Sequence, residues 1–544
     1  MARGGHRHAG RLAPRRAGVP GVRGDRGLMP ASGPHATALH VVIRADAAPA
    51  IGTGHVMRCL TLADRLRAMG AVVRFICRAH GGHLRDLIAA RGFAVELLPA
   101  PDAAFAAAGH AGWLGASQAQ DAADTLALLG SSPRPDWLVV DHYGIDQEWQ
   151  RLLRPAARHI LVIDDLADRV HDCDVLVDQN LAPAGAARYD GLVPAHCARL
   201  CGPRYALLRE EFAEARATLA ARDGTVRRLF VFLGGADQHN DTGSVLSALA
   251  GIDDIETDVV IGGANPHHEA LARQCAALPG VRLHRQVDNV AALMARADLA
   301  IGAGGGAMWE RCSVGLPALV LALADNQRPG CAALAEIGGT LYLGASGPDS
   351  GARLAAALQV ARTSPWLLRH MSETGLALVD GQGADRVARR LAAQGLADGL
   401  TLRRATLADR DDIHAWRNAE AIRRVSGDTR PVALEAHREW FAKVLSDPER
   451  VLLVGEIDGR AAGVLRYDRN GAQVTVSVYL TPAYLGKGIG PALLAQGTAW
   501  VARHWPGVDT IEAVIRPDNV ASSAAFASAG YRHEFDIYRL RIQA

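Results

Sequence analysis

The stretch "HVVIRADAAPAIGTGHVMRCLTLADRL", His40 to Leu66, decides the fold of the first part of the chain. A β-branched run ends in a glycine turn, and a helical pattern follows. The apolar residues at helical spacing are Val56, Leu60, Ala63 and Leu66. This order predicts a buried strand, a turn at Gly52 and Gly54, and a helix whose first turn holds His55. In an open α/β sheet, a side chain just beyond the carboxyl end of a strand lies where ligands bind.

The local pattern leaves two interpretations of His55. The glycine turn can offer free backbone N–H groups and an imidazole to one small ligand. The same residues also suit an ordinary helix N-terminus with a capping histidine. A single Gly-x-Gly does not decide between a catalytic and a structural role.

Length and composition limit the class of protein. The 544 residues exceed one hydrophobic core, so three or four domains are expected. A net charge of +2 and 49% hydrophobic residues indicate a globular protein, not a nucleic-acid-binding or disordered one. Lysine occurs only at Lys443 and Lys487 among 59 basic residues. Because that skew reflects overall composition, arginine content is not evidence for phosphate binding.

The eight cysteines form no CxxC pair, which favours free thiols in a reducing cytoplasm. His196, Cys197 and Cys201 lie close in sequence but lack a second ligand pair, so no metal is expected. No apolar run is long enough for a membrane span. We therefore expect a cytoplasmic protein with no membrane partner.

Residues 1–38 differ from the rest of the chain. They carry seven arginines against Asp25 alone and show no apolar period. Because a secretory signal needs a continuous apolar region, none is predicted. We expect a disordered Arg-rich tail, or a segment upstream of the true start with Met29 as an alternative initiator.

Residues 39–206 and residues 207–398 show the same alternation of predicted strands and helices. Short apolar runs end in polar or glycine-rich turns and alternate with helical patterns, which is typical of doubly wound parallel sheets. Two Rossmann-like domains joined around "CGPRYALLREEF" are predicted. A sugar nucleotide fits a cleft between the carboxyl edges of two such sheets.

The second of these domains carries two amide-rich turns. "GAGGGAMWERCSVGLPAL" places Gly302 to Gly306 between a strand and a helix, where backbone N–H groups can receive a diphosphate. Glu310 follows one helical turn later, near enough to accept hydrogen bonds from ribose. A tight turn with a solvated glutamate is the structural alternative. "LGGAD", Leu233 to Asp237, provides a second such turn and favours nucleotide binding.

The pattern changes in residues 399–544. A hairpin turn is predicted at Asp458 and Gly459, and "QVTVSVYLT" alternates with a strand period of two. A glycine loop then opens a long helix and forms an anion cradle outside any dinucleotide fold. The mixed order of elements predicts an α+β domain.

Residues 39–398 resemble the UDP-sugar hydrolase family of pseudaminic acid biosynthesis, which releases UDP from UDP-2,4-diacetamido-2,4,6-trideoxy-β-L-altropyranose. The motifs are "IRADAAPAIGTGHVMRCLTLA", "VVDHYGID", "DVLVDQN", "CGPRYALLREEF", "LGGAD" and the loop with Glu310. The resemblance implies a glycosyltransferase-B-like architecture without a metal, and His55 and Tyr143 as catalytic residues. The implied substrate-binding residues are Gly52, Gly54, Asp46, Asn180, Gly304, Gly305, Gly306 and Glu310.

Residues 399–544 resemble the GCN5-related N-acetyltransferases, through "LGKGIG", "NVASSAAFASAGY" and "WRN". The "WRN" motif is similar to the subgroup that acetylates amino sugars of the same pathway. The resemblance implies acetyl-CoA as cosubstrate, held by Val478, Leu480, Gly486, Lys487, Gly488, Gly490 and Asn519. Asn519 equally suits a helix N-cap. Two positions depart from the family: Leu485 replaces an arginine or glutamine, and Phe526 replaces a tyrosine that often acts as general acid.

The implied hydrolysis needs a base for the water. His55 can serve if a neighbour, Asp46 or Tyr143, orients its other nitrogen, and attack opposite UDP predicts inversion. Two other interpretations keep the fold: a transferase that moves the sugar to an acceptor, and a nucleotide-sugar sensor without catalysis. The expected partners are a UDP-sugar and acetyl-CoA, with no nucleic acid. Sugar stereochemistry and oligomeric state are not readable from the sequence.

Overall fold

The computed structural model describes residues 38–130, 133–235, 237–263, 265–287 and 289–534. The Arg-rich segment predicted to be disordered, 1–38, lies outside these residues except for Ala38.

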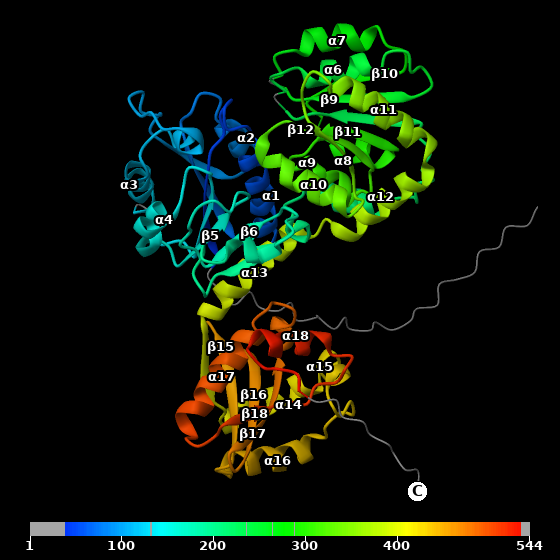
Figure 1. The fold of residues 1–544 in the computed structure, drawn as a ribbon. Helices are drawn as coiled ribbons and strands as arrows, with labels where there is room; N and C mark the ends of the chain where they lie inside the picture. Colours follow the sequence, from blue (N-terminus) through cyan, green and yellow to red (C-terminus); the bar gives the residue numbers. More distant parts are fainter. Residues whose placement is uncertain (1–37, 131–132, 236, 264, 288, 535–544) are drawn as a thin grey trace, which may run out of the picture. The chain divides into compact units, whose positions relative to one another are not determined.

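The first sheet is parallel throughout and has seven strands in the order β3-β2-β1-β4-β5-β6-β7. Figure 1 labels two of these strands, β5 and β6. The strands are β1 (His40–Ala45), β2 (Val72–Arg78), β3 (Ala94–Leu98), β4 (Trp137–Asp141), β5 (His159–Ile163), β6 (Val175–Asp178) and β7 (Ala198–Cys201). The strand order reverses between β1 and β4, where Ala45 pairs with Asp141. Ligands of open α/β sheets bind beyond the carboxyl ends at such a reversal.

Helices connect these strands as the sequence predicts. They are α1 (Gly54–Ala68), α2 (Arg85–Ala90), α3 (Gln118–Leu129) and α4 (Gln147–Leu153), with a 3-10 segment η1 (Gly109–Leu114) before α3. The four apolar residues of α1 singled out by their spacing are all buried. The predicted helix with His55 in its first turn is therefore confirmed.

The second sheet is also parallel and has the order β10-β9-β8-β11-β12-β13. Its strands are β8 (Arg228–Phe232), β9 (Glu256–Ile261), β10 (Val281–Arg285), β11 (Leu299–Ala303), β12 (Ala318–Ala322) and β13 (Leu341–Ala345). Its helices are α5 (Glu210–Ala217), α6 (Asp241–Ala248), α7 (His268–Ala276), α8 (Val290–Arg296), α9 (Ala307–Ser313), α10 (Arg328–Glu336), α11 (Ser350–Thr363) and α12 (Pro365–Leu378). The order reverses between β8 and β11, the two strands followed by the predicted amide-rich turns.

One helix that the sequence assigns to the second domain packs against the first sheet. The sequence groups residues 207–398 together, but α13 (Gly383–Asp398) contributes Val387, Ala388 and Leu391 to the core of the first sheet. The Trp137 indole N–H also donates to the backbone carbonyl of Leu391, 3.2 Å away. The chain thus returns to the first sheet before the C-terminal domain begins.

The C-terminal domain has a mixed five-stranded sheet in chain order. Its strands are β14 (Leu400–Arg404), β15 (Arg450–Ile457), β16 (Arg460–Asn470), β17 (Gln473–Leu480) and β18 (Thr510–Glu512). Its helices are α14 (Arg410–Asn418), α15 (Glu420–Val425), α16 (Leu434–Ser446), α17 (Gly490–His504) and α18 (Val520–Ser528). Asp458 and Gly459 form the predicted hairpin turn, both with positive φ. Two Rossmann-like domains followed by an α+β domain are therefore confirmed.

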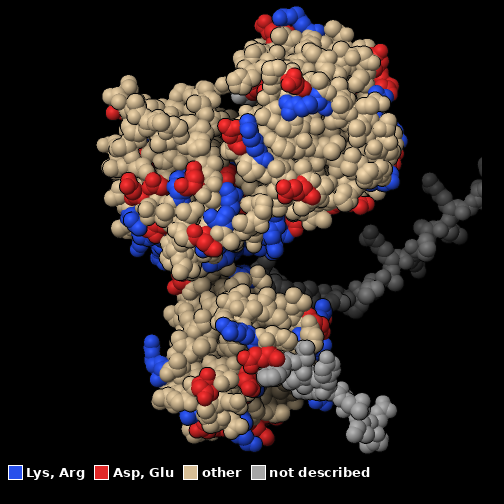
Figure 2. Space-filling model, viewed as in Figure 1, with Lys and Arg blue, Asp and Glu red and all other residues tan. Residues whose placement is uncertain are grey.

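The surface shown in Figure 2 carries acidic and basic side chains interspersed over the described residues, not separated by sign. All eight cysteines are free. In the part of the chain that the structure describes, every helix falls short of the length and apolar character that crossing a membrane requires.

Candidate functional site

His55 lies at the point where the first sheet changes strand order. It is the second residue of α1, which follows β1, and only 8% of its side chain is exposed. The turn before it closes through the Gly52 N–H, which donates to the carbonyl of Ala48. Among the described residues, no acceptor receives a hydrogen bond from the N–H groups of Gly54 or His55. Gly54 is exposed, so a ligand can reach this helix N-terminus.

A carboxylate orients the imidazole. His55 Nδ1 lies 2.6 Å from Asp141 Oδ1, at the carboxyl end of β4. Arg58, one turn further along α1, donates to both oxygens of Asp141 over 2.6 and 2.7 Å. With Nδ1 facing a carboxylate, a neutral imidazole carries its proton on Nδ1 and leaves Nε2 as an acceptor. No described residue hydrogen-bonds to Nε2.

Asp141 is held in its ionised form. Burial alone raises the pKa of its carboxyl, but the charges and hydrogen bonds of Arg58 and His55 lower that pKa well below its usual range. The group therefore stays an anion at every pH at which the protein is expected to work. A carboxylate on one ring nitrogen fixes the orientation of the ring and leaves the other nitrogen free to accept a proton.

Tyr143 packs against the same imidazole. Its ring meets that of His55 edge-on, with centroids 4.6 Å apart, and its hydroxyl donates to Asp165 over 2.7 Å. Arg58 also pairs with Asp165. Burial, and then the charge of Asp165, raise the pKa of the Tyr143 phenol well above its usual value. Tyr143 therefore remains a neutral hydrogen-bond donor.

Two aromatic residues that the sequence did not single out complete this cluster. Trp113, in η1, stacks on Tyr143 with an interplanar angle of 26° and a centroid distance of 5.8 Å. His110 packs against Trp113, 4.5 Å between centroids. Both residues lie in a segment of η1 with no regular apolar period, so no pattern pointed to them. They give one side of the His55 site an aromatic wall.

The prediction that Asp46 contacts the substrate or orients His55 is wrong. Asp46 is fully buried, and its Oδ1 accepts hydrogen bonds from the Arg44 side chain and the Arg78 backbone N–H, both over 2.6 Å. Its Oδ2 faces His142 and His80, with nitrogens 3.5 and 3.6 Å away. Asp46 belongs to a buried charge network beneath the site, because Arg44 and Arg78 both donate hydrogen bonds to its carboxylate.

Asn180 lies just beyond β6. Its backbone N–H donates to Asp178 Oδ1 over 2.9 Å, and the residue is half-buried. Burial, and then the charge of Asp165, raise the pKa of Asp178 to about 7. Asn180 thus lies at the carboxyl edge of the sheet that also carries His55, but no contact tests its predicted sugar-binding role.

His142 provides a prediction about pH. Its Nδ1 accepts from the Gly144 N–H over 3.0 Å, and burial lowers the pKa of its imidazole to about 4. Because the unfolded chain binds this proton near pH 6.5 and the folded chain does not, stability falls as pH drops from 6.5 toward 4. The loss from this residue is about 2 kcal/mol at pH 5. Urea unfolding of wild type and His142→Asn at pH 7 and pH 5 measures it, and an equal drop in both proteins contradicts the assignment.

The glycine loop of the second sheet leaves two amides free. Gly304 must lack a side chain, since a Cβ there would lie 2.1 Å from Cys331 Sγ. Its N–H donates to the Leu321 carbonyl. Within the described ranges, the N–H groups of Gly305 and Gly306 have no acceptor, and Gly306 is exposed. The predicted loop is therefore formed, and its binding role stays a prediction.

Glu310 faces an arginine that the sequence did not single out. Its carboxylate lies 3.6 Å from Arg209, which is also 2.9 Å from Glu211. Burial raises the pKa of Glu310, while Arg209 opposes that effect. Arg209 precedes α5 and reaches Glu310 across about 100 residues of chain, so sequence spacing gave no signal for this pair.

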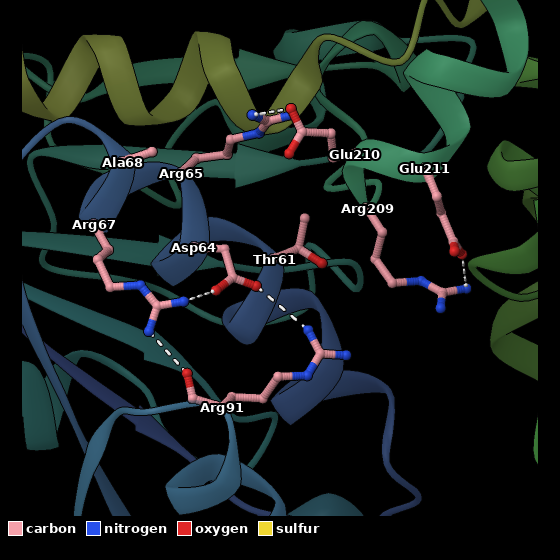
Figure 3. Close-up of a pocket in the computed structure, with 9 residues that line it drawn as sticks. All are labelled: Thr61, Asp64, Arg65, Arg67, Ala68, Arg91, Arg209, Glu210 and Glu211. Carbon is pink, nitrogen blue, oxygen red and sulfur yellow. Dashed lines mark hydrogen bonds and ion pairs between the residues drawn. The ribbon is translucent and has the colours of Figure 1, made fainter. Parts of the chain in front are cut away.

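Arg209 and Glu211 also line a pocket with the C-terminal half of α1 and with Arg91 (Figure 3). Ion pairs already satisfy most of its charged groups: Arg65 with Glu210, and Asp64 with both Arg67 and Arg91. His55 lies at the opposite end of α1. This pocket is therefore separate from the imidazole and its partners.

In the C-terminal domain, β17 and β18 pair only over Gln473 to Thr475. β17 continues to Leu480 on its other side, paired with β16. The edge of β17 that carries Val478 and Leu480 thus has no β18 partner among the described residues, and alternate backbone groups there face a pocket. Such an edge can hold an extended ligand by backbone hydrogen bonds.

The predicted glycine loop before α17 is formed, and its role as an anion cradle stays a prediction. Gly486 and Gly488 have φ of +73° and +77°, and Gly490 is the first residue of the helix, which has no side-chain cap. The Lys487 ammonium lies over the Tyr484 ring, 5.1 Å from its centroid. This loop presents backbone amides at the positive end of a 15-residue helix.

The structure shows the N-cap role that the sequence allowed for Asn519, whose side chain accepts from the Ser522 N–H over 3.1 Å. Phe526 is buried against Tyr531, with centroids 4.9 Å apart. It offers no proton donor. In the part of the chain that the structure describes, no group of three or more His, Cys, Asp or Glu side chains could hold a metal ion.

Comparisons with known proteins identify relatives of this chain and a domain model that matches its C-terminal part. Residues 399–532 match the family model of the acetyltransferase (GNAT) domain. The UDP-2,4-diacetamido-2,4,6-trideoxy-β-L-altropyranose hydrolase of Campylobacter jejuni is 28% identical over 259 residues, 47% of this chain and 81% of that protein. The spore coat polysaccharide biosynthesis protein SpsG of Bacillus subtilis is 32% identical over 189 residues, 34% of this chain and 56% of that protein. The match thus spans little more than half of the Bacillus protein.

Among solved structures, MurG of Acinetobacter baumannii is similar, with 13% identity and a TM-score of 0.46 over 65% of this chain and 99% of that one. Part of this chain is thus similar to the Campylobacter hydrolase, and its residues 399–532 match the GNAT acetyltransferase domain.

Proposed function

We propose that the chain is a bifunctional, cytoplasmic enzyme of pseudaminic acid biosynthesis. Its first part hydrolyses UDP-2,4-diacetamido-2,4,6-trideoxy-β-L-altropyranose to the free sugar and UDP, with inversion and without a metal. Its GNAT domain transfers an acetyl group from acetyl-CoA to the UDP-4-amino sugar that precedes this substrate. The observation that carries the hydrolase is the imidazole of His55, held through Nδ1 by the ionised Asp141.

In this proposal His55 is the general base. Its Nε2 accepts a proton from water as the water oxygen attacks the anomeric carbon. The bond between that carbon and the diphosphate oxygen breaks, and UDP leaves as an anion. Asp141 stabilises the imidazolium that forms, as an oriented carboxylate does in other histidine-based sites.

The departing UDP needs a partner for its charge. The free amides of Gly305 and Gly306 can donate to the diphosphate. Glu310 is the proposed partner of the ribose hydroxyls, which would replace its interaction with Arg209. Gly52, Gly54 and Asn180 remain the proposed contacts on the sugar side, and the Trp113 ring adds an apolar surface beside Tyr143.

The acetyltransferase proposal rests on the unpaired edge of β17 and the cradle before α17. The cradle would hold the diphosphate of acetyl-CoA, and a backbone N–H near Val478 to Leu480 would stabilise the tetrahedral oxyanion. The neutral amine attacks the thioester carbon, the C–S bond breaks, and CoA leaves as the thiol. Because Phe526 has no acidic hydrogen, we do not assign the proton donor to its position.

The cradle makes a testable prediction. Gly486→Val forces a β-branched residue into the left-handed region, where Cβ meets no neighbour but the backbone is strained. We expect acetyl-CoA affinity of the full chain to fall about tenfold, because the amides no longer converge on the phosphates. Isothermal titration measures this. Gly471→Val places the same strain in the β16–β17 turn and should leave affinity unchanged, so equal losses in both variants would remove the cradle from the proposal.

One experiment tests both activities. The full chain is given UDP-4-amino-4,6-dideoxy-β-L-AltNAc with acetyl-CoA, and the products are followed by mass spectrometry. We expect the diacetamido nucleotide sugar first, and then UDP with the free diacetamido sugar. Acetylation without UDP release disproves the hydrolase, whereas UDP release only from pre-acetylated substrate disproves the acetyltransferase. NMR of the sugar formed at early times shows whether the anomer is inverted.

A further inference from the structure

The GNAT domain carries a pocket whose charge the proposed function has not used. On the side away from β18 it is lined by α14, α15, α16, β16 and β17. The apolar lining there includes Ile413, Ile422, Val464 and Trp440. Two arginines, Arg417 and Arg466, are the only charged side chains that these five elements contribute to the pocket among the described residues.

Arg417 lines the pocket, and one nitrogen of its guanidinium group has no hydrogen-bond acceptor among the described residues. It lies in the last turn of α14, and its Nη2 donates to the backbone carbonyl of Asp428 over 2.9 Å. Its Nη1 is buried and has no hydrogen-bond partner. A buried guanidinium nitrogen without an acceptor is costly, so this position favours an anion from outside the chain.

Arg466 approaches the same place from the sheet. It lies on β16 opposite Ser477, and its guanidinium carbon is 5.9 Å from the centre of the Trp440 ring. Its Nε is 2.9 Å from Asp468 but makes no aligned hydrogen bond.

Tyr479 shows that the two arginines converge. Burial raises the pKa of its phenol, and the positive charges of Arg417 and Arg466 both act on it in the opposite direction. The Tyr479 hydroxyl donates to the Ile413 carbonyl over 3.4 Å, one helical turn before Arg417 on α14. On β17, Ser477 lies two residues from Tyr479 on the same face and pairs with Arg466 of β16, so both arginines come from elements next to this phenol. Tyr479 itself lines the pocket.

Carboxylates lie elsewhere in this pocket. The acidic residues that line it are Asp509 just before β18, Glu512 at the end of β18, and Glu534 beyond it. Glu512 pairs with Thr475, four residues before Tyr479 on β17. The charged lining residues that α14 and β16 contribute are thus both arginines, which disfavours a polycationic amine as acceptor.

We infer that Arg417 and Arg466 bind the diphosphate of the acceptor, so that the GNAT domain selects an amine carried on a nucleoside diphosphate over the same amine without it. This inference rests on the proposed acetyltransferase function and names the residues that would recognise its substrate. Two guanidinium groups suit a diphosphate because each can donate two parallel hydrogen bonds to phosphate oxygens.

The test compares two acceptors with the full chain. One is the UDP-linked amino sugar, and the other is its methyl glycoside, which has the same amine but no phosphate. The His55→Ala background prevents hydrolysis of the acceptor. For Arg417→Gln and Arg466→Gln we expect KM for the UDP-linked acceptor to rise about tenfold to a hundredfold, with kcat and the KM for acetyl-CoA unchanged. KM for the glycoside should stay within about twofold.

Arg424→Gln is the matched control, since Arg424 lies on the exposed face of α15 and pairs with Glu420. It should change neither KM. An equal rise for both acceptors in the pocket variants assigns the arginines a structural role and overturns the inference. Weaker acetyl-CoA binding in those variants assigns them to the cofactor and overturns it as well.

A second measurement is independent of catalysis. Equilibrium dialysis of labelled UDP should give two sites per wild-type chain, one of them in the hydrolase part, and one site in the Arg417→Gln/Arg466→Gln double variant. A number of sites that is the same in the wild type and in the double variant overturns the inference. If the wild type binds two UDP molecules but acetylates neither acceptor, the acetyltransferase proposal fails while the diphosphate site stands.

Discussion

Replacing His55 with alanine is expected to reduce UDP release from the diacetamido nucleotide sugar by about 10²- to 10⁴-fold, the range by which a positioned general base accelerates a reaction. The change removes the imidazole whose Nδ1 lies 2.6 Å from the Asp141 carboxylate and which the proposal makes the general base. His55→Asn should lose activity to a similar extent, because an amide cannot accept the proton from water. The measurement is the initial rate of UDP release by the full chain.

The acetyltransferase domain supplies the control for folding. Because the proposed acetyl transfer would use residues 399–532, which match the GNAT domain, and not His55, its rate should be unchanged in both variants. His83→Asn alters a histidine beyond β2 whose Nδ1 accepts from the Arg85 N–H, 3.4 Å away, and should leave UDP release intact. Near wild-type UDP release in His55→Ala, or a product that keeps its anomeric configuration, would falsify the proposed role.

Most strands could be predicted because each one is marked by a short run of residues in its own sequence. Buried parallel strands are continuous apolar runs, so β1, β4 and β11 can be identified from the sequence alone. Two edge strands were not singled out: every residue of β7 and β13 is only half-buried. The position of α13 was also missed, since an amphipathic helix shows which face is apolar but not which sheet covers it.

The partner of His55 shows where sequence reasoning ends. Asp141 stands 86 residues from His55, in the quoted motif "VVDHYGID", but nothing local relates the two. The strand order does, because β1 pairs with β4 and brings Ala45 opposite Asp141. Asp46 is closer to His55 in the sequence than Asp141 is. Its carboxylate is occupied by a hydrogen bond from the Arg78 backbone N–H, and no local sequence pattern predicts that long-range contact either.

Asp141→Asn is expected to lower UDP release about as much as the loss of His55, by 10²- to 10⁴-fold. An asparagine amide can donate to Nδ1, which favours the tautomer with the proton on Nε2, the nitrogen that must accept one. It also removes the negative charge that stabilises the imidazolium. Because the pKa of Asp141 lies well below its usual range, its charge is constant above about pH 5 and the wild-type rate should show no titration from it.

Asp165→Asn tests whether Asp141 acts by orienting His55 or only by adding a negative charge near Arg58. Asp165 pairs with Arg58 and accepts from Tyr143, as Asp141 pairs with Arg58, but it makes no contact with the imidazole. Its loss should therefore cost UDP release about tenfold or less. Thermal unfolding of both variants shows whether either one loses the fold. If the two changes slow UDP release equally while both proteins stay folded, the carboxylates act together by holding Arg58, and the orientation of His55 by Asp141 is not what drives the reaction.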